Sequence, residues 1–206
     1  MNLKWLPNTV TIIRCVLAIY VGYLILNMGA DLDDRREPGL WLFVPFLVFS
    51  FVAATDWLDG ALARGLDAES PLGARLDPIA DKLLTGASLL TLAHVDSWGL
   101  ILTPPALAIV GRDLLITAIR EAMGNPGNLK VSNSAKWKTA VALIGIGLTL
   151  FGMAVSGYVP SSEEGSAAWL ASRGALLAGI VAIWIAAIMS VLTAIDYVSA
   201  MTRQSR

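Results

Sequence analysis

The sequence predicts an all-α integral membrane protein in which six transmembrane helices form one domain over residues 1–206. Hydrophobic residues make up 56% of the chain and charged residues only 15%, whereas a soluble domain carries about 25% charged residues. Six segments reach the length of about 20 mostly apolar residues that a helix needs to cross a bilayer. None of them shows the alternating apolar and polar residues of a transmembrane β-strand.

The expected spans cover residues 9–28, 39–62, 76–93, 98–119, 135–155 and 168–198. The run Pro7-Asn8-Thr9 predicts the start of the first span, with Asn8 or Thr9 as its cap. Residues 1–6 before it, with Lys4 and Trp5, are expected to form a short N-terminal segment at the membrane interface.

The basic residues predict the orientation of these spans. An even number of spans places both termini on one side, and twelve of the fifteen basic residues fall toward that side; the other three are Arg35, Arg36 and Arg173. Because loops rich in Lys and Arg stay in the cytoplasm, we expect a multi-pass protein of the cell (inner) membrane with cytoplasmic termini. A basic inner face suits membrane lipids or an anionic substrate, and no basic patch studded with aromatic residues indicates nucleic acid.

One segment places carboxylates between two apolar stretches. It reads TDWLDGALARGLDAESPLGARLDPIADK, from Thr55 to Lys82. Asp56 and Asp59 are three residues apart at the end of the second span, and Asp77 and Asp81 are four apart at the start of the third. Such spacings share a helix face. Since a short loop over 65–72 makes the helices antiparallel neighbours, the four carboxylates are expected to face each other across one cleft.

Four negative charges in a partly dry site take up protons or bind cations. Carboxylates suit Mg²⁺, Mn²⁺ or Ca²⁺, and two such ions can assist displacement at phosphorus. Gly60 and Ala63 leave room for a ligand, and Arg64 can bind a phosphate. Pro78 disfavours a helical Asp77, so we expect Asp77 to cap the third helix or to lie at a kink. The alternative, solvated loop charges, accounts for the acids at 67 and 69 but poorly for the four spaced aspartates.

A second group of cations lies farther along the chain. Arg112 and Arg120 are two helical turns apart on one face, and Lys136 and Lys138 lie at the start of the fifth span. We interpret these four as a site for an acceptor that carries its own phosphate. Two alternatives remain open: Arg112 pairs with Asp113 or with an acid of the cluster, and the lysines are ordinary cytoplasmic anchors.

Small residues in the last two spans indicate close helix packing. They are Gly145, Gly147, Gly152, Ala171, Ala175 and Gly179. Packing within the bundle is the favoured interpretation, and a dimer interface is the alternative. The single cysteine, Cys15, is read as a small buried side chain, and the single histidine, His94, disfavours a zinc site rich in His and Cys.

The acidic segment fits D-x2-D-G-x2-A-R-x8-G-x3-D-x3-D at all eight positions and so resembles the CDP-alcohol phosphatidyltransferase family. The resemblance implies a six-helix membrane enzyme, usually a homodimer, that transfers a phosphatidyl group from CDP-diacylglycerol to an alcohol at a cytoplasmic active site and releases CMP. It implies two divalent cations, Mg²⁺ or Mn²⁺, on Asp56, Asp59, Asp77 and Asp81, with Asp81 also the catalytic general base. The residues it implies for binding CDP-diacylglycerol are Asn8, Asp56, Gly60, Ala63, Arg64, Ser70 and Gly73.

Five short segments, PNTVTIIR, TDWLDGALAR, LDPIADKL, RDLLITAIRE and KWKT, resemble the phosphatidylglycerophosphate synthase branch, whose acceptor is sn-glycerol 3-phosphate. Arg112, Arg120, Lys136 and Lys138 would then hold the acceptor phosphate. The alternatives are a sibling enzyme with inositol phosphate or a phospholipid as acceptor (cardiolipin synthase type), a cation transporter, and a non-catalytic scaffold with the same fold.

Overall fold

The structure is a computed structural model that describes residues 6–33, 39–62, 73–122, 133–159 and 164–204. Within these ranges the backbone alone is described at 6–10, 33, 56–62, 73–81, 120–122, 133–136, 198 and 200–204. The predicted interfacial segment therefore lies, except for Leu6, outside the described residues.

The described part of the chain is helical and contains no strand, which confirms the predicted all-α class. Its elements are α1 (Leu6–Asp33), a 3-10 helix η2 (Leu40–Phe43), α2 (Val44–Leu62), α3 (Gly73–Val95), α4 (Thr103–Ala122), α5 (Asn133–Ser156) and α6 (Ala167–Gln204). Each predicted span overlaps one α-helix, and the second also includes η2. Since α1 begins at Leu6, Asn8 and Thr9 lie inside its first turn, and the prediction that one of them caps it is wrong. Pro7 allows this because a first-turn residue has no intrahelical hydrogen bond to donate.

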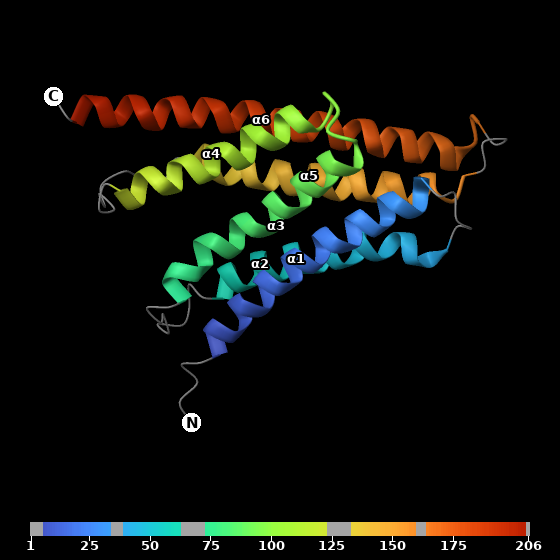
Figure 1. Cartoon of the computed structure of the whole chain (residues 1–206), viewed down its shortest axis with the longest axis horizontal. Helices are drawn as coiled ribbons and strands as arrows, with labels where there is room; N and C mark the ends of the chain where they lie inside the picture. The colour runs from blue at the N-terminus through green and yellow to red at the C-terminus, as the bar shows by residue number, and fades with distance from the viewer. Residues whose placement is uncertain (1–5, 34–38, 63–72, 123–132, 160–163, 205–206) are drawn as a thin grey trace.

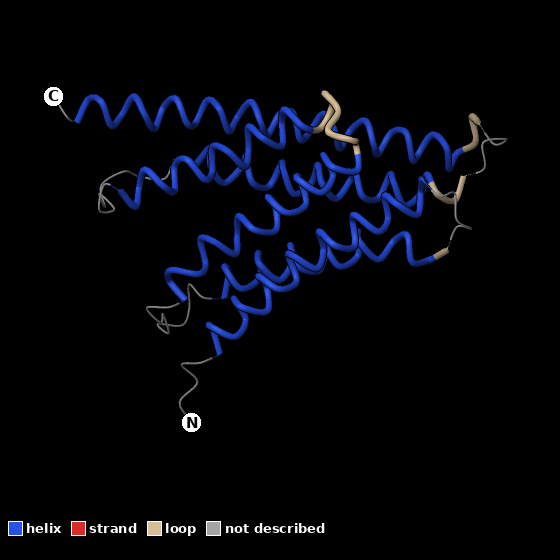
Figure 2. The backbone as a smooth tube through the Cα atoms, in the orientation of Figure 1, coloured by secondary structure: helices blue, strands red, loops and turns tan. Residues whose placement is uncertain are grey.

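Consecutive helices run in opposite directions (Figures 1 and 2). The start of α1 and the end of α6 consequently lie at the same end of the molecule, together with the ends of α2 and α4 and the starts of α3 and α5 (Figure 1). This end holds the two described parts of the acidic segment, residues 55–62 and 73–82, and we call it the acidic end. The longest helix, α6, has 38 residues and measures about 57 Å at 1.5 Å per residue.

A tight turn separates α3 from α4 and moves the start of α4 from the predicted residue 98 to Thr103. Ser97 and Trp98 both have positive φ, 52° and 57°. The Ser97 amide donates to the carbonyl of His94 and the Trp98 amide to that of Ala93, each at 2.8 Å, which is the hydrogen-bond pattern of a Schellman helix end. The helix restarts where prolines at 104 and 105 fit its first turn.

Small residues bring α5 and α6 into backbone contact. A Cβ atom on Gly179 would lie 2.7 Å from the Thr149 amide nitrogen and 2.8 Å from the Gly145 carbonyl oxygen. Nearby, the Ser172 hydroxyl donates to the carbonyl of Gly152 at 3.0 Å. Packing inside the bundle is therefore the role of Gly145, Gly152 and Gly179, as the sequence predicts.

The surface of the bundle is apolar around its middle. Large hydrophobic side chains are exposed on every α-helix except α3, whose side chains are described only over residues 82–95; examples are Ile19, Phe51, Leu107, Ile144 and Leu177. Among the described residues, three helices are long and apolar enough to cross a membrane: α1 over Thr11–Leu32, α5 over Trp137–Ser156 and α6 over Ala167–Tyr197. An apolar surface of this kind is what a helical bundle presents to lipid.

The α5–α6 contact predicts a stability difference between two glycines of one helix. Gly179→Ala forces the two backbones apart and is expected to lower the melting temperature in detergent by about 3–10 °C. Gly174→Ala is the matched control, since a Cβ there meets nothing within 4 Å, and its melting temperature should be unchanged or slightly higher because alanine favours helix. Equal effects of the two substitutions would contradict the packing.

Candidate active site

The four aspartates of the acidic segment lie in helical backbone at the acidic end. Asp56 and Asp59 fall in the last two turns of α2, and Asp77 and Asp81 lie one helical turn apart in α3. Their side chains lie outside the described residues. The prediction that Asp77 caps α3 is wrong, because α3 begins at Gly73 and continues through Pro78 with the loss of one backbone hydrogen bond.

Five of the other predicted site residues have a described backbone near the same end. Their positions are Asn8 in the first turn of α1, Gly60 in the last turn of α2, Gly73 as the first residue of α3, Arg120 in the last turn of α4, and Lys136 in the first turn of α5. The backbone thus gathers positions from five helices at one end of the bundle (Figure 1). Ala63, Arg64 and Ser70 lie outside the described residues.

Two of the predicted phosphate-binding cations meet at one carboxylate, Asp113. The Lys138 ammonium nitrogen lies 2.6 Å from Asp113 Oδ1, and Arg112 Nη1 lies 3.0 Å from the same oxygen. Arg112 Nη2 also donates to the hydroxyl of Thr193 on α6 at 3.2 Å. We call Arg112, Asp113, Lys138 and Thr193 the Asp113 cluster. It joins α4, α5 and α6.

The Asp113 cluster is largely shielded from solvent. The exposed fraction of the side chain is 6% for Lys138 and 17% for both Arg112 and Asp113. An ionised side chain at such a position needs a partner of opposite charge. A lysine that anchors the protein at the membrane interface would be exposed, so the anchor interpretation does not hold for Lys138. The local pairing of Arg112 with Asp113, left open by the sequence, is present. Two cations share one carboxylate, and the cluster retains an excess positive charge.

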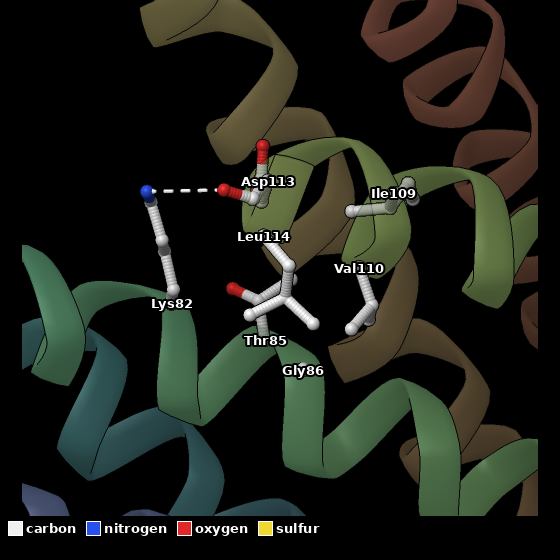
Figure 3. A pocket seen from close by; sticks show the side chains of 7 residues that line it. All are labelled: Lys82, Thr85, Gly86, Ile109, Val110, Asp113 and Leu114. Atoms are coloured by element: carbon white, nitrogen blue, oxygen red, sulfur yellow. Dashed lines mark hydrogen bonds between the residues drawn. The ribbon is translucent and has the colours of Figure 1, made fainter. Parts of the chain in front are cut away.

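Lys82 fastens α3 to α4 and was not predicted as a site residue. Its ammonium group donates to the hydroxyl of Thr117 and, at 3.4 Å, to the backbone carbonyl of Asp113. Thr117 donates to the same carbonyl at 2.7 Å. Figure 3 shows Lys82 reaching from α3 to Asp113 on α4. Because Lys82 directly follows Asp81, this contact ties the acidic part of α3 to the Asp113 cluster.

A cavity of about 50 Å³ lies between α3 and α4 beside these residues. Its walls are Lys82, Thr85, Gly86, Ile109, Val110, Asp113 and Leu114 (Figure 3). It has room for a water molecule, which needs about 10–15 Å³, and is far smaller than a pocket for a nucleotide or lipid, which takes about 300–1,000 Å³. We therefore do not assign the substrate to this cavity.

The sequence also matches a known protein family. The sequence model of the family described as CDP-alcohol phosphatidyltransferase matches residues 4–198. The chain belongs to the CDP-alcohol phosphatidyltransferase family. The match extends from α1 to α6 and includes all four aspartates and the Asp113 cluster.

Several relatives share the name of one enzyme within this family. The chain is 37% identical over 152 residues to the CDP-diacylglycerol–glycerol-3-phosphate 3-phosphatidyltransferase of Pseudomonas fluorescens, covering 70% of this chain and 71% of the relative. It is 30% identical over 217 residues to the Cereibacter sphaeroides protein of the same name, covering 95% of each. A CMP-forming cardiolipin synthase of Oryza sativa is 37% identical over 117 residues, covering 50% of this chain and 35% of the relative.

The bridge between α3 and α4 predicts coupling between Lys82 and Thr117. Lys82→Met and Thr117→Val should each lower the free energy of unfolding, and the double variant should lose about 1 kcal/mol less than the sum. Detergent unfolding titrations measure all four proteins. Thr91→Val is the control on α3, because within the described part of the chain the Thr91 hydroxyl bonds only carbonyls of its own helix. Strictly additive losses for Lys82 and Thr117 would contradict the bridge.

Proposed function

We propose that this protein transfers the phosphatidyl group of CDP-diacylglycerol to sn-glycerol 3-phosphate, giving phosphatidylglycerol phosphate and CMP. The observation that carries the proposal is the similarity to a CDP-diacylglycerol–glycerol-3-phosphate 3-phosphatidyltransferase over 95% of both chains. Those predicted substrate-binding positions whose backbone the structure describes lie toward one end of the bundle, which supports the assignment.

The donor site is assigned to the acidic ends of α2 and α3. Asp56, Asp59, Asp77 and Asp81 offer carboxylate oxygens, the ligands that Mg²⁺ and Mn²⁺ prefer, and they come from consecutive antiparallel helices. Two bound divalent cations would neutralise the pyrophosphate of CDP-diacylglycerol and polarise it. Asn8, Gly60, Ala63, Arg64, Ser70 and Gly73 are assigned to the nucleotide and pyrophosphate.

Asp81 is assigned as the general base. It would take the proton of the acceptor hydroxyl, whose oxygen then attacks the phosphorus that bears the lipid, while the bond from that phosphorus to CMP breaks. Arg64 can stabilise the departing CMP with its fork of donors. The lysine bridge after Asp81 keeps this part of α3 in a fixed position against α4, which is what an in-line attack requires.

The acceptor phosphate is assigned to Arg112 and Lys138, with Arg120 and Lys136 toward the end of the bundle. Phosphate binds well to cations that are held in place and partly desolvated, and the Asp113 cluster supplies an excess positive charge under these conditions. An acceptor with its own phosphate fits such a site better than a neutral alcohol does.

For the membrane we propose six spans in the inner membrane, with the acidic end in the cytoplasm. The basic residues favour this orientation, and it gives the active site access to water-soluble glycerol 3-phosphate and CMP. We further propose that the protein works as a homodimer, as the family resemblance implies.

One alternative acceptor is favoured by a specific observation. The similarity to a CMP-forming cardiolipin synthase, over 50% of this chain, fits a phospholipid acceptor at the same donor site. A phospholipid acceptor is bound in the membrane and glycerol 3-phosphate in water, so an assay with each substance separates the two.

Purified protein in mixed micelles is expected to release CMP from CDP-diacylglycerol when glycerol 3-phosphate and Mg²⁺ or Mn²⁺ are present. Removal of the divalent cations with EDTA should abolish the reaction, and their return should restore it. CMP release with phosphatidylglycerol but not with glycerol 3-phosphate would assign the cardiolipin synthase reaction instead. Cation flux through liposomes without CMP release would instead support the alternative that the protein is a cation transporter.

Asp81→Asn is expected to lower kcat by about 10²–10⁴-fold, because the amide cannot accept the hydroxyl proton. Binding of CDP-diacylglycerol should be weakened much less, since three carboxylates remain. Asp67→Asn removes an acid from the same segment but outside the motif and should leave both quantities unchanged. Near-normal turnover by Asp81→Asn would show that another group is the base.

A further inference from the structure

We propose that Asp113 is the positioning residue for the acceptor, which sets where Arg112 and Lys138 present their charges and how far these lie from the general base. The proposal rests on the function proposed above and adds a residue that neither the motif nor the sequence analysis assigned to the site. It is carried by the contacts that the Asp113 carboxylate and its backbone carbonyl make.

The carboxylate fixes two long side chains from different helices. Its Oδ1 atom accepts from Lys138 on α5 at 2.6 Å and from Arg112 on α4 at 3.0 Å. Lysine and arginine lose much rotamer freedom when they are held in one geometry. Since Asp113 orders both before any substrate arrives, an incoming phosphate meets cations that are already in place.

The backbone of the same residue is tied to the helix that carries the base. Lys82, the residue after Asp81, donates to the Asp113 carbonyl and to Thr117, which also donates to that carbonyl. Asp113 is thus linked to α3 through its carbonyl and to the two cations through its carboxylate. In glycerol 3-phosphate the reacting hydroxyl and the phosphate are separated by a fixed number of bonds, so this residue governs whether both ends fit at once.

Asp113 can act on phosphate binding through its charge or through the position that it gives the two cations. These two effects predict opposite results for Asp113→Asn. Asp113→Asn raises the net charge of the cluster by one, and simple Coulomb attraction would then strengthen phosphate binding. Positioning predicts the reverse, because the neutral amide that replaces the carboxylate binds the two cations more weakly and no longer orders them. The direction of the change in the KM for glycerol 3-phosphate therefore separates the two accounts.

The test compares steady-state kinetics of the full-length wild type, Asp113→Asn, Asp113→Glu and Asp196→Asn in mixed micelles. For Asp113→Asn the KM for glycerol 3-phosphate should rise about tenfold, the loss of one charge-assisted contact, while the KM for CDP-diacylglycerol changes less than about twofold. Asp113→Glu keeps the charge but displaces it by one methylene, and should raise the acceptor KM about threefold. The exposed Asp196 is the matched control, and its substitution should change neither KM.

An acceptor KM that falls in Asp113→Asn, or two KM values that rise together, would overturn the proposal. If the melting temperature shows that Asp113→Asn does not fold, the acceptor KM of Asp113→Glu becomes the test. An unchanged acceptor KM in that variant overturns the proposal. A wild-type protein that releases CMP only with a phospholipid acceptor refutes the proposed acceptor alone. The same comparison with that acceptor, whose phosphate would meet the same two cations, then tests Asp113.

Discussion

The pairing of a buried lysine and a half-buried arginine with one carboxylate is the constraint on which the acidic end of this bundle depends. Charges in an apolar helical bundle are costly unless they are paired, and loss of one partner costs about 3–5 kcal/mol because the other charge is left unpaired. Asp113 contacts Lys138 and Arg112, and Arg112 contacts Thr193. These contacts fix how far α4, α5 and α6 are shifted along their axes relative to one another. Apolar packing alone would tolerate small shifts of this kind.

The helices are held together by close backbone packing in one part of the bundle and by polar contacts in another. Away from the acidic end, Gly145 and Gly179 let α5 and α6 touch backbone to backbone, and the outer surface is apolar as lipid requires. Toward the acidic end, polar contacts replace close packing: Lys82 joins α3 to α4, and the Asp113 cluster joins α4 to its neighbours. The donor site is assigned to α2 and α3 and the acceptor site to α4 and α5, so the bridge at Lys82 connects the two halves of the proposed reaction.

The six helices and the family could be predicted from the sequence, because long apolar runs and the eight-position motif depend only on local order. Helix starts were less predictable. Pro78 predicts that Asp77 caps α3 or lies at a kink, but α3 starts earlier and includes both residues, which excludes the cap. The sequence predicts only part of the Asp113 cluster. Arg112 and Lys138 are recognisable as cations in apolar spans, whereas nothing in the sequence indicates that Thr193 contacts Arg112. That two cations converge on one oxygen depends on side-chain geometry between two helices, α4 and α5.

We propose that the end of α2 and the start of α3 hold divalent cations beside a phosphate site at Arg112 and Lys138. Anomalous diffraction from crystals grown with Mn²⁺, a CDP-diacylglycerol analogue and glycerol 3-phosphate tests it most directly. The account predicts two manganese peaks among Asp56, Asp59, Asp77 and Asp81, about 3.5–4 Å apart, with the acceptor phosphate on Arg112 and Lys138. Manganese bound elsewhere, or an acceptor phosphate that contacts neither cation, would contradict it.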